Sequence, residues 1–449
     1  MSRLTEEYRK KLVTPDQAVK TVKSGDWVYY GHFTMAPRAL DEALSKRVGE
    51  VSDVKVRGVS ALLPPKIALA DPEKKSFIYH SGFYGHQDRM LGDKGLCYFI
   101  PANYSDEPRL LRDGYAARPN VAMISTTDMD EKGYFNFSAS CSYSGAICEM
   151  ADTVIVEVNR KAPRCLGGSQ ESVHISRVDL VVEGDSLPLV TLPEIVPTEV
   201  NKIIARLVAE ELEDGCCLQL GIGGMPNTIG KLIAESDLKD LGVHSEMISD
   251  AFVDLSEKGK ITGARKNIDR YKMTYTFALG SQRLYDFIDN NTACATYPSD
   301  LTNSVVRIAR NDKQVSINNA IEIDLYGQVC SESVGFRQIS GTGGQLDFTL
   351  GAYHSKGGKA FICLSSTTTN KAGEQISRIV HHIRPGGVIT VPRTVSFYIV
   401  TEYGKSNLKG KSTWQRAEAL IGLAHPDFRE GLIREAEKMG IWASHNKKF

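Results

Sequence analysis

The amino-acid sequence predicts an α/β protein built from two tandem domains of similar topology. Short runs rich in Val, Ile and Leu alternate with helical stretches along nearly the whole chain. Such alternation is typical of parallel or mixed sheets that are covered by helices. A chain of 449 residues is also too long for one ordinary core, so two domains of roughly 200 residues each are expected.

The apolar runs give the positions of the expected elements. We expect strands at residues 26–30, 54–58, 121–125, 153–158, 315–318, 360–364 and 388–391. Helices are expected where apolar residues recur with helical spacing, at residues 38–44, 227–233, 414–424 and 428–436.

A weak internal repeat divides the chain. In each half a helical run, at residues 15–24 or 198–214, precedes an apolar strand, a glycine (Gly31 or Gly221) and then a proline that begins another helix. Proline suits a helix start because its missing N–H costs nothing there. We therefore predict domains at residues 1–190 and 191–449, with the boundary in the proline-rich stretch that follows residue 187.

Composition excludes several classes of function. Lys plus Arg and Asp plus Glu both number 54, so no basic excess points to nucleic acid. The polar N-terminus lacks an apolar signal core, and no apolar run approaches the ~20 residues of a membrane span. The nine scattered cysteines are typical of reduced, buried thiols. We expect a cytoplasmic protein.

The first glycine cluster lies between an expected strand and an expected helix. Gly221, Ile222, Gly223 and Gly224 form a turn whose backbone N–H groups could bind an anion. It is not a dinucleotide fingerprint, because Pro226 stands where the last glycine would be. A tight turn without any ligand is the alternative.

Shortly after that turn comes Glu246, between the apolar Val243 and Met247. This setting favours partial burial, which is costly for a carboxylate unless donors hold it. Beside backbone donors, the carboxylate could attack a carbonyl and form an acyl intermediate. A lone glutamate is more often a surface group, and for the nearby His244 we favour a packing or hydrogen-bond role over a catalytic one.

A second glycine cluster strengthens the acyl-transfer hypothesis. Gly341, Gly343 and Gly344 follow a short expected strand and precede Gln345, which is a candidate substrate-binding residue. Two glycine loops in one domain could supply the two donors of an oxyanion hole. Alternatively, this loop only needs positive φ angles for a turn. No metal site is expected, because the adjacent pair His381-His382 lacks a third ligand at a suitable spacing.

Taken together, these motifs resemble those of the acetyl-CoA hydrolase/transferase family. The resemblance runs nearly end to end and is carried by residues 221–227, 244–247, 324–327, 341–348, 400–404 and 424–428. Three further stretches are similar to the butyryl-CoA:acetate CoA-transferase branch, which is related to the 4-hydroxybutyrate CoA-transferases: residues 165–168, 173–176 and 250–254.

The resemblance implies two CoA-transferase-type α/β domains and a catalytic role for Glu246, which would carry CoA as a glutamyl-CoA thioester. It also implies that backbone N–H groups near Ile222 and in Gly343-Gly344 form the oxyanion hole. Asn303 matches an active-site asparagine of the family, and Glu402 is expected near the CoA moiety. The implied substrates are an acyl-CoA and a short-chain carboxylate, with no resident cofactor or metal, in a homo-oligomer.

The sequence leaves other functions open. A CoA-thioester hydrolase would use the same glutamate with water as the acceptor. A 4-hydroxybutyrate or propionate CoA-transferase would differ in its acyl pocket. A sugar-phosphate isomerase-like or ligand-binding module would use Glu246 as a proton-shuttling base instead of a nucleophile.

Overall fold

The computed structural model describes residues 3–193, 195–221 and 224–447, and its Cα packing divides the chain into two compact units. Unit 1 comprises Met1–Pro193, Glu246–Ser249 and Lys272–Asn303. Unit 2 comprises Glu194–Ser245, Asp250–Tyr271 and Ser304–Phe449. Glu246 therefore packs with unit 1, although it lies in the second half of the sequence.

Unit 1 contains a parallel sheet of order β4-β3-β2-β1-β5-β7-β9. Its strands are β1 (Trp27–Tyr30), β2 (Val54–Gly58), β3 (Phe77–Ser81), β4 (Tyr98–Phe99), β5 (Val121–Thr126), β7 (Thr153–Val158) and β9 (Leu180–Glu183). Alternate residues of one strand belong to different core clusters: Ala122 and Ile124 lie in one, Val121 and Met123 in the other. Both faces of the sheet are therefore covered, as its continuous apolar strands predict.

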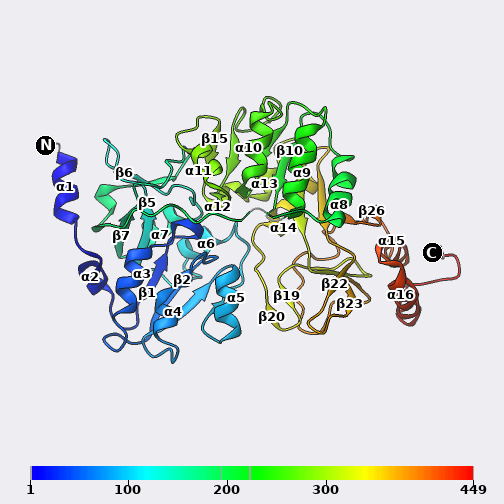
Figure 1. The fold of residues 1–449 in the computed structure, drawn as a ribbon, viewed down its shortest axis with the longest axis horizontal. Helices are drawn as coiled ribbons and strands as arrows, with labels where there is room; N and C mark the ends of the chain where they lie inside the picture. The colour runs from blue at the N-terminus through cyan, green and yellow to red at the C-terminus, as the bar shows by residue number, and fades with distance from the viewer. Residues whose placement is uncertain (1–2, 194, 222–223, 448–449) are drawn as a thin grey trace. The chain divides into compact units, whose positions relative to one another are not determined.

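Helices of unit 1 flank this sheet (Figure 1). They are α1 (Arg3–Lys11), α2 (Pro15–Ala18), α3 (Arg38–Ser45), α4 (Lys66–Ala70), α5 (His86–Asp93), α6 (Glu107–Arg112), α7 (Ser144–Met150), α11 (Gln282–Ile288) and α12 (Ser299–Thr302), with 3-10 turns η1 (Val19–Thr21), η2 (Phe33–Met35) and η3 (Ile175–Arg177). Three short strand pairs complete the unit: β6 (Tyr134–Asn136) with β8 (Ser172–His174), β12 (Met247–Ile248) with β14 (Phe277–Ala278), and β13 (Met273–Tyr275) with β15 (Cys294–Thr296).

Unit 2 repeats this plan. Its sheet has the order β11-β10-β16-β21-β25-β26, and the last strand, β26, is antiparallel to β25. The bounds are β11 (Gly242–His244), β10 (Cys217–Leu220), β16 (Gln314–Asn319), β21 (Lys359–Cys363), β25 (Tyr398–Thr401) and β26 (Gly404–Asn407).

Helices and short ribbons surround the sheet of unit 2. The helices are α8 (Glu199–Ala209), α9 (Gly224–Glu235), α10 (Asp250–Glu257), α13 (Val305–Ala309), α14 (Gln345–His354), α15 (Thr413–Leu423) and α16 (Pro426–Lys438). The ribbons are β17 (Glu322–Asp324) between β18 (Val329–Cys330) and β24 (Ile379–Val380), β19 (Ser333–Val334) with β20 (Arg337–Gln338), and β22 (Thr367–Thr369) with β23 (Gln375–Ser377).

Backbone hydrogen bonds reproduce the sequence repeat. Gly31 N donates to Met123 O on β5 at 2.9 Å, and Gly221 N donates to Ile317 O on β16 at 3.1 Å. These four residues occupy matching positions, because β1 pairs with β5 and β10 pairs with β16 in the same register relative to the two glycines. This shared strand register confirms the prediction of two topologically similar α/β halves.

Two expectations for local structure were wrong. Residues 388–391 form no strand; only Val391 makes an isolated bridge, to Val329, while Val388 and Ile389 are 40% and 44% exposed. Because the first two residues of this run are exposed and the last two are buried, its apolar character does not reflect a strand covered on both faces. The first helical run is also shorter than expected, because α2 ends at Ala18 and passes into the turn η1.

Candidate active site

Glu246 lies in a bend between β11 and β12. Its carbonyl oxygen accepts hydrogen bonds from Thr276 N at 2.9 Å and Phe277 N at 3.3 Å. The residue is partly exposed, whereas Met247, which follows it, is buried. Backbone pairing with β14 thus fixes the main chain while the carboxylate stays accessible.

Asn303 holds the carboxylate of Glu246. Its Nδ2 donates to Glu246 Oε2 at 2.6 Å. An ionised carboxylate only accepts, so the amide nitrogen must face it. Asn303 is fully buried directly after α12, and its Oδ1 has no hydrogen-bond partner among the described residues. The structure thus brings together two of the residues proposed from sequence, and a carboxylate held in this way can act as a nucleophile or a base.

A buried polar chain lies in the same unit. Ser142 Oγ is hydrogen bonded to the hydroxyl of Tyr104 and lies 2.6 Å from His32 Nδ1. Burial, with a further contribution from Arg57, lowers the pKa of His32 to about 3, so its imidazole is neutral at neutral pH. Burial also raises the pKa of Tyr104, and the negative charge of nearby Glu246 raises it further.

Sequence reasoning missed all three members of this chain. His32 directly follows Gly31, the glycine that ends β1, and this position was the only local signal available. Tyr104 and Ser142 belong to no recognisable motif.

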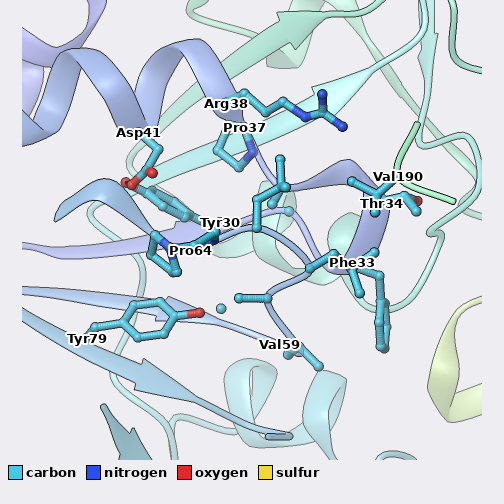
Figure 2. Close-up of a pocket in the computed structure, with 17 residues that line it drawn as sticks. Tyr30, Phe33, Thr34, Pro37, Arg38, Asp41, Val59, Pro64, Tyr79 and Val190 are labelled. Atoms are coloured by element: carbon cyan, nitrogen blue, oxygen red, sulfur yellow. The ribbon is translucent and has the colours of Figure 1, made fainter. Parts of the chain in front are cut away.

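An apolar hollow opens beside Phe33 at the carboxyl ends of β1 and β2 (Figure 2). It contains about 530 Å³ of space, part of it open to solvent. Its apolar lining includes Phe33, Val59 and Leu62. Asp41, also in the lining, already accepts hydrogen bonds from Tyr30 and from the backbone of Lys66, which occupy its carboxylate.

Stacked rings connect this hollow with the strand pair that holds Glu246. Phe33 stacks on Phe277 with ring centroids 4.0 Å apart and planes inclined by 11°. Phe277 N is one of the donors to Glu246 O. The hollow is thus separated from the backbone of the candidate nucleophile by one stacked aromatic pair.

The glycine clusters lie in unit 2. Gly221 follows β10 and Gly224 begins α9, whereas Ile222 and Gly223 lie outside the described residues. A Cβ atom at Gly224 would approach the side chains of Ile195 to 3.1 Å and Asn201 to 3.2 Å, so a larger residue here would displace these neighbours slightly.

The second cluster precedes α14. Gly343 has a φ of +53°, which favours glycine, and Thr342 Oγ1 donates to the buried Glu332 at 3.2 Å. Gln345 begins the helix, and its Nε2 donates to Asn319 O at 3.3 Å. Asn319 is the last residue of β16, and Gly221 N donates to Ile317 O of the same strand. Both glycine clusters therefore lie at the carboxyl end of β16. That strand lies at the point where the strand order reverses, the usual ligand crevice of α/β sheets.

Glu402 contacts the end of β21. Its carboxylate accepts from Ser366 N at 2.9 Å and from Ser366 Oγ at 2.6 Å. These bonds fix the turn after β21. Gly341, between Ser340 and Thr342, is buried.

Two features are absent from the described part of the chain. No group of three or more His, Cys, Asp or Glu residues is arranged there to hold a metal ion. Nor does any described helix have the length and apolar character needed to cross a membrane.

Comparisons with known proteins agree with the two halves of the fold. Residues 1–193 match the acetyl-CoA hydrolase/transferase N-terminal domain, and residues 280–436 match the C-terminal domain of the same family. The chain is 52% identical to the butyryl-CoA:acetate CoA-transferase of Anaerostipes caccae, over 98% of this chain and 99% of that protein. It is 38% identical to the 4-hydroxybutyrate coenzyme A transferase of Clostridium kluyveri, over 96% and 99%. The crystal structure of RipA from Yersinia pestis superposes with a TM-score of 0.89 at 36% identity, covering 98% and 100%.

The depressed pKa of His32 predicts acid sensitivity. Between the folded value of about 3 and the ordinary value near 6.5, the unfolded chain binds one more proton than the folded chain, so stability falls as the pH falls. From pH 7.5 to 5.5 the loss from this group is about 1.4 kcal/mol. We expect His32→Asn to unfold in urea with a pH dependence smaller by that amount. An unchanged pH dependence would contradict the neutral, buried state of His32.

Proposed function

The chain belongs to the acetyl-CoA hydrolase/transferase family, and we propose that it is a CoA-transferase that moves CoA between butyryl-CoA and acetate. The observation that carries the proposal is the partly exposed carboxylate of Glu246, held at 2.6 Å by the buried amide of Asn303. The higher identity to a butyryl-CoA:acetate enzyme than to a 4-hydroxybutyrate enzyme supports the choice of substrates.

The proposed reaction begins with attack of the Glu246 carboxylate on the thioester carbonyl. The C–S bond breaks, which leaves an acyl-glutamyl anhydride and the CoA thiolate. The thiolate then attacks the glutamyl carbonyl, releases butyrate and leaves a glutamyl-CoA thioester. Acetate reverses these steps through an acetyl-glutamyl anhydride and leaves as acetyl-CoA. Both intermediates keep the energy of the thioester only while water is excluded.

Asn303 and the two glycine clusters have proposed parts in this reaction. Asn303 orients the carboxylate for attack, which lowers the entropic part of the barrier. Backbone N–H groups of the two glycine clusters stabilise the oxyanion of each tetrahedral intermediate, where one donor is typically worth ~2.7–4 kcal/mol. CoA enters as part of the acyl-CoA substrate, so the scheme requires no resident cofactor.

The apolar hollow beside Phe33 is proposed to receive the acyl chain. Its lining offers Phe33, Val59 and Leu62, and its buried acid Asp41 is already hydrogen bonded. An unbranched apolar chain of a few carbons needs such a surface and no further polar partner.

A product assay with butyryl-CoA distinguishes transfer from hydrolysis. We expect acetyl-CoA to form only when acetate is added, with ping-pong kinetics. Free CoA released at the same rate without acetate would identify a hydrolase. Mass-resolved detection of both thioesters separates the two outcomes in one experiment.

Replacement of the proposed nucleophile gives the second prediction. Glu246→Ala is expected to lower transfer at least ~10³-fold, because no covalent intermediate can form. The control is Glu257→Ala, at the exposed last residue of α10. Hydroxylamine added after acyl-CoA should label residue 246 in the natural protein only. Retained transfer in Glu246→Ala would exclude the covalent mechanism.

Filling the hollow tests the acyl site. Val59 is 4% exposed, and Val59→Phe places a larger side chain in the same lining. We expect kcat/KM for butyryl-CoA to fall by about tenfold or more relative to acetyl-CoA, because two methylenes lose their space. Turnover of acetyl-CoA and thermal unfolding of the variant report whether it still folds. An unchanged ratio would place the acyl chain elsewhere.

A further inference from the structure

Ser142 is fully buried and has a left-handed backbone, with a φ of +48°. Non-glycine residues rarely adopt this conformation, and the surrounding structure must hold them in it. Serine at a position that glycine would fill without strain therefore indicates that its side chain is needed.

The side chain of Ser142 is anchored on two sides. Tyr104 contributes its hydroxyl, and His32 contributes Nδ1 at 2.6 Å. Both partners are buried, and neither is near Ser142 in the sequence, from which they are 38 and 110 residues distant. The anchor therefore ties the left-handed turn before α7 to segments that follow β1 and β4.

The backbone of Ser142 is bonded to both segments that carry the candidate active site. Its N–H donates to Thr276 O at 3.1 Å, and Thr276 N donates to Glu246 O at 2.9 Å. On the other side, Ser299 N donates to Ser142 O at 2.8 Å, and Asn303 N donates to Ser299 O at 2.9 Å. The two peptide groups of one residue thus support the two ends of the Asn303–Glu246 hydrogen bond.

We infer that Ser142 is a positioning residue that sets the relative placement of Glu246 and Asn303. Its hydroxyl, held by Tyr104 and His32, keeps the left-handed backbone in place. That backbone in turn aligns Thr276 and Ser299, and through them the carboxylate and its amide donor. This inference rests on the proposed function of Glu246 as a nucleophile, because only then does the alignment affect the chemical step.

Replacement of Ser142 by two different residues separates a positioning role from a chemical one. Alanine loses the anchor and keeps the strain of a positive φ, whereas glycine loses the anchor but adopts this φ without strain. Positioning therefore predicts transfer activity in the order serine, glycine, alanine. We expect Ser142→Ala to lower kcat by about tenfold or more with KM nearly unchanged, and Ser142→Gly to recover part of the loss.

Ser138 provides a matched control. It is also buried and left-handed, with a φ of +56°, but its Oγ donates to Pro163 O at 2.6 Å and does not join the network of Tyr104 and His32. Ser138→Ala and Ser138→Gly should therefore alter thermal stability without the drop in kcat. Equal kcat losses for alanine and glycine at position 142, or equal effects at both positions, would overturn the inference.

Two further measurements keep this inference separate from the proposed function. In the Asn303→Ala background, Ser142→Ala should cost much less than in the natural protein, because the bond it aligns is already gone. A crystal structure of Ser142→Ala should show the Asn303–Glu246 distance lengthened from 2.6 Å. An unchanged distance contradicts the inference even if Glu246 is the nucleophile. Full transfer by Glu246→Ala contradicts the proposed function whatever the structure shows.

Discussion

The hydrogen bond from Asn303 to Glu246 is the interaction on which the rest of the candidate site depends. A carboxylate at the edge of an apolar core needs a donor, and this donor is fully buried at the end of a short helix. Neither partner is held by its own element alone. Ser142, a buried residue with a left-handed backbone, is hydrogen bonded to both supporting segments.

The two halves use the same topology differently. In unit 1 the carboxylate of Glu157, near the end of β7, accepts hydrogen bonds from Arg38 N and Leu40 N, both at 2.9 Å, in the first turn of α3. Two backbone N–H groups at the start of α3 are therefore hydrogen bonded to a side chain of the protein itself. Strand register places Cys363 of β21 at the matching position of unit 2. That side chain is buried, and burial raises the pKa of its thiol, so it brings no negative charge to the crevice. The two units thus differ at this matching position, where one has a carboxylate hydrogen bonded to a helix start and the other a buried thiol.

Much of the fold follows from local sequence pattern. The β-branched runs at residues 121–125 and 153–158 became buried central strands, because a strand covered on both faces must be apolar throughout. The glycines that end β1 and β10 mark the same turn in each half, because both make the same hydrogen bond to the neighbouring strand. Residues 388–391 show where this reasoning fails. Their apolar pattern is that of a strand, but the backbone hydrogen bonds of Thr390 N and Val391 N both go to Val329 O, which gives an isolated bridge and no strand.

The sequence by itself determined the α/β class and the repeat, and it proposed two members of the candidate site, Glu246 from its setting and Asn303 from the resemblance to the family. Tertiary structure alone decided that Glu246 packs with the first half of the chain and that its donor comes from a residue 57 positions away. It also decided the contacts of Ser142 with Tyr104 and His32. The physical reason is that strand and turn preferences act between near neighbours. A buried polar network instead forms between residues that only the packed core brings together.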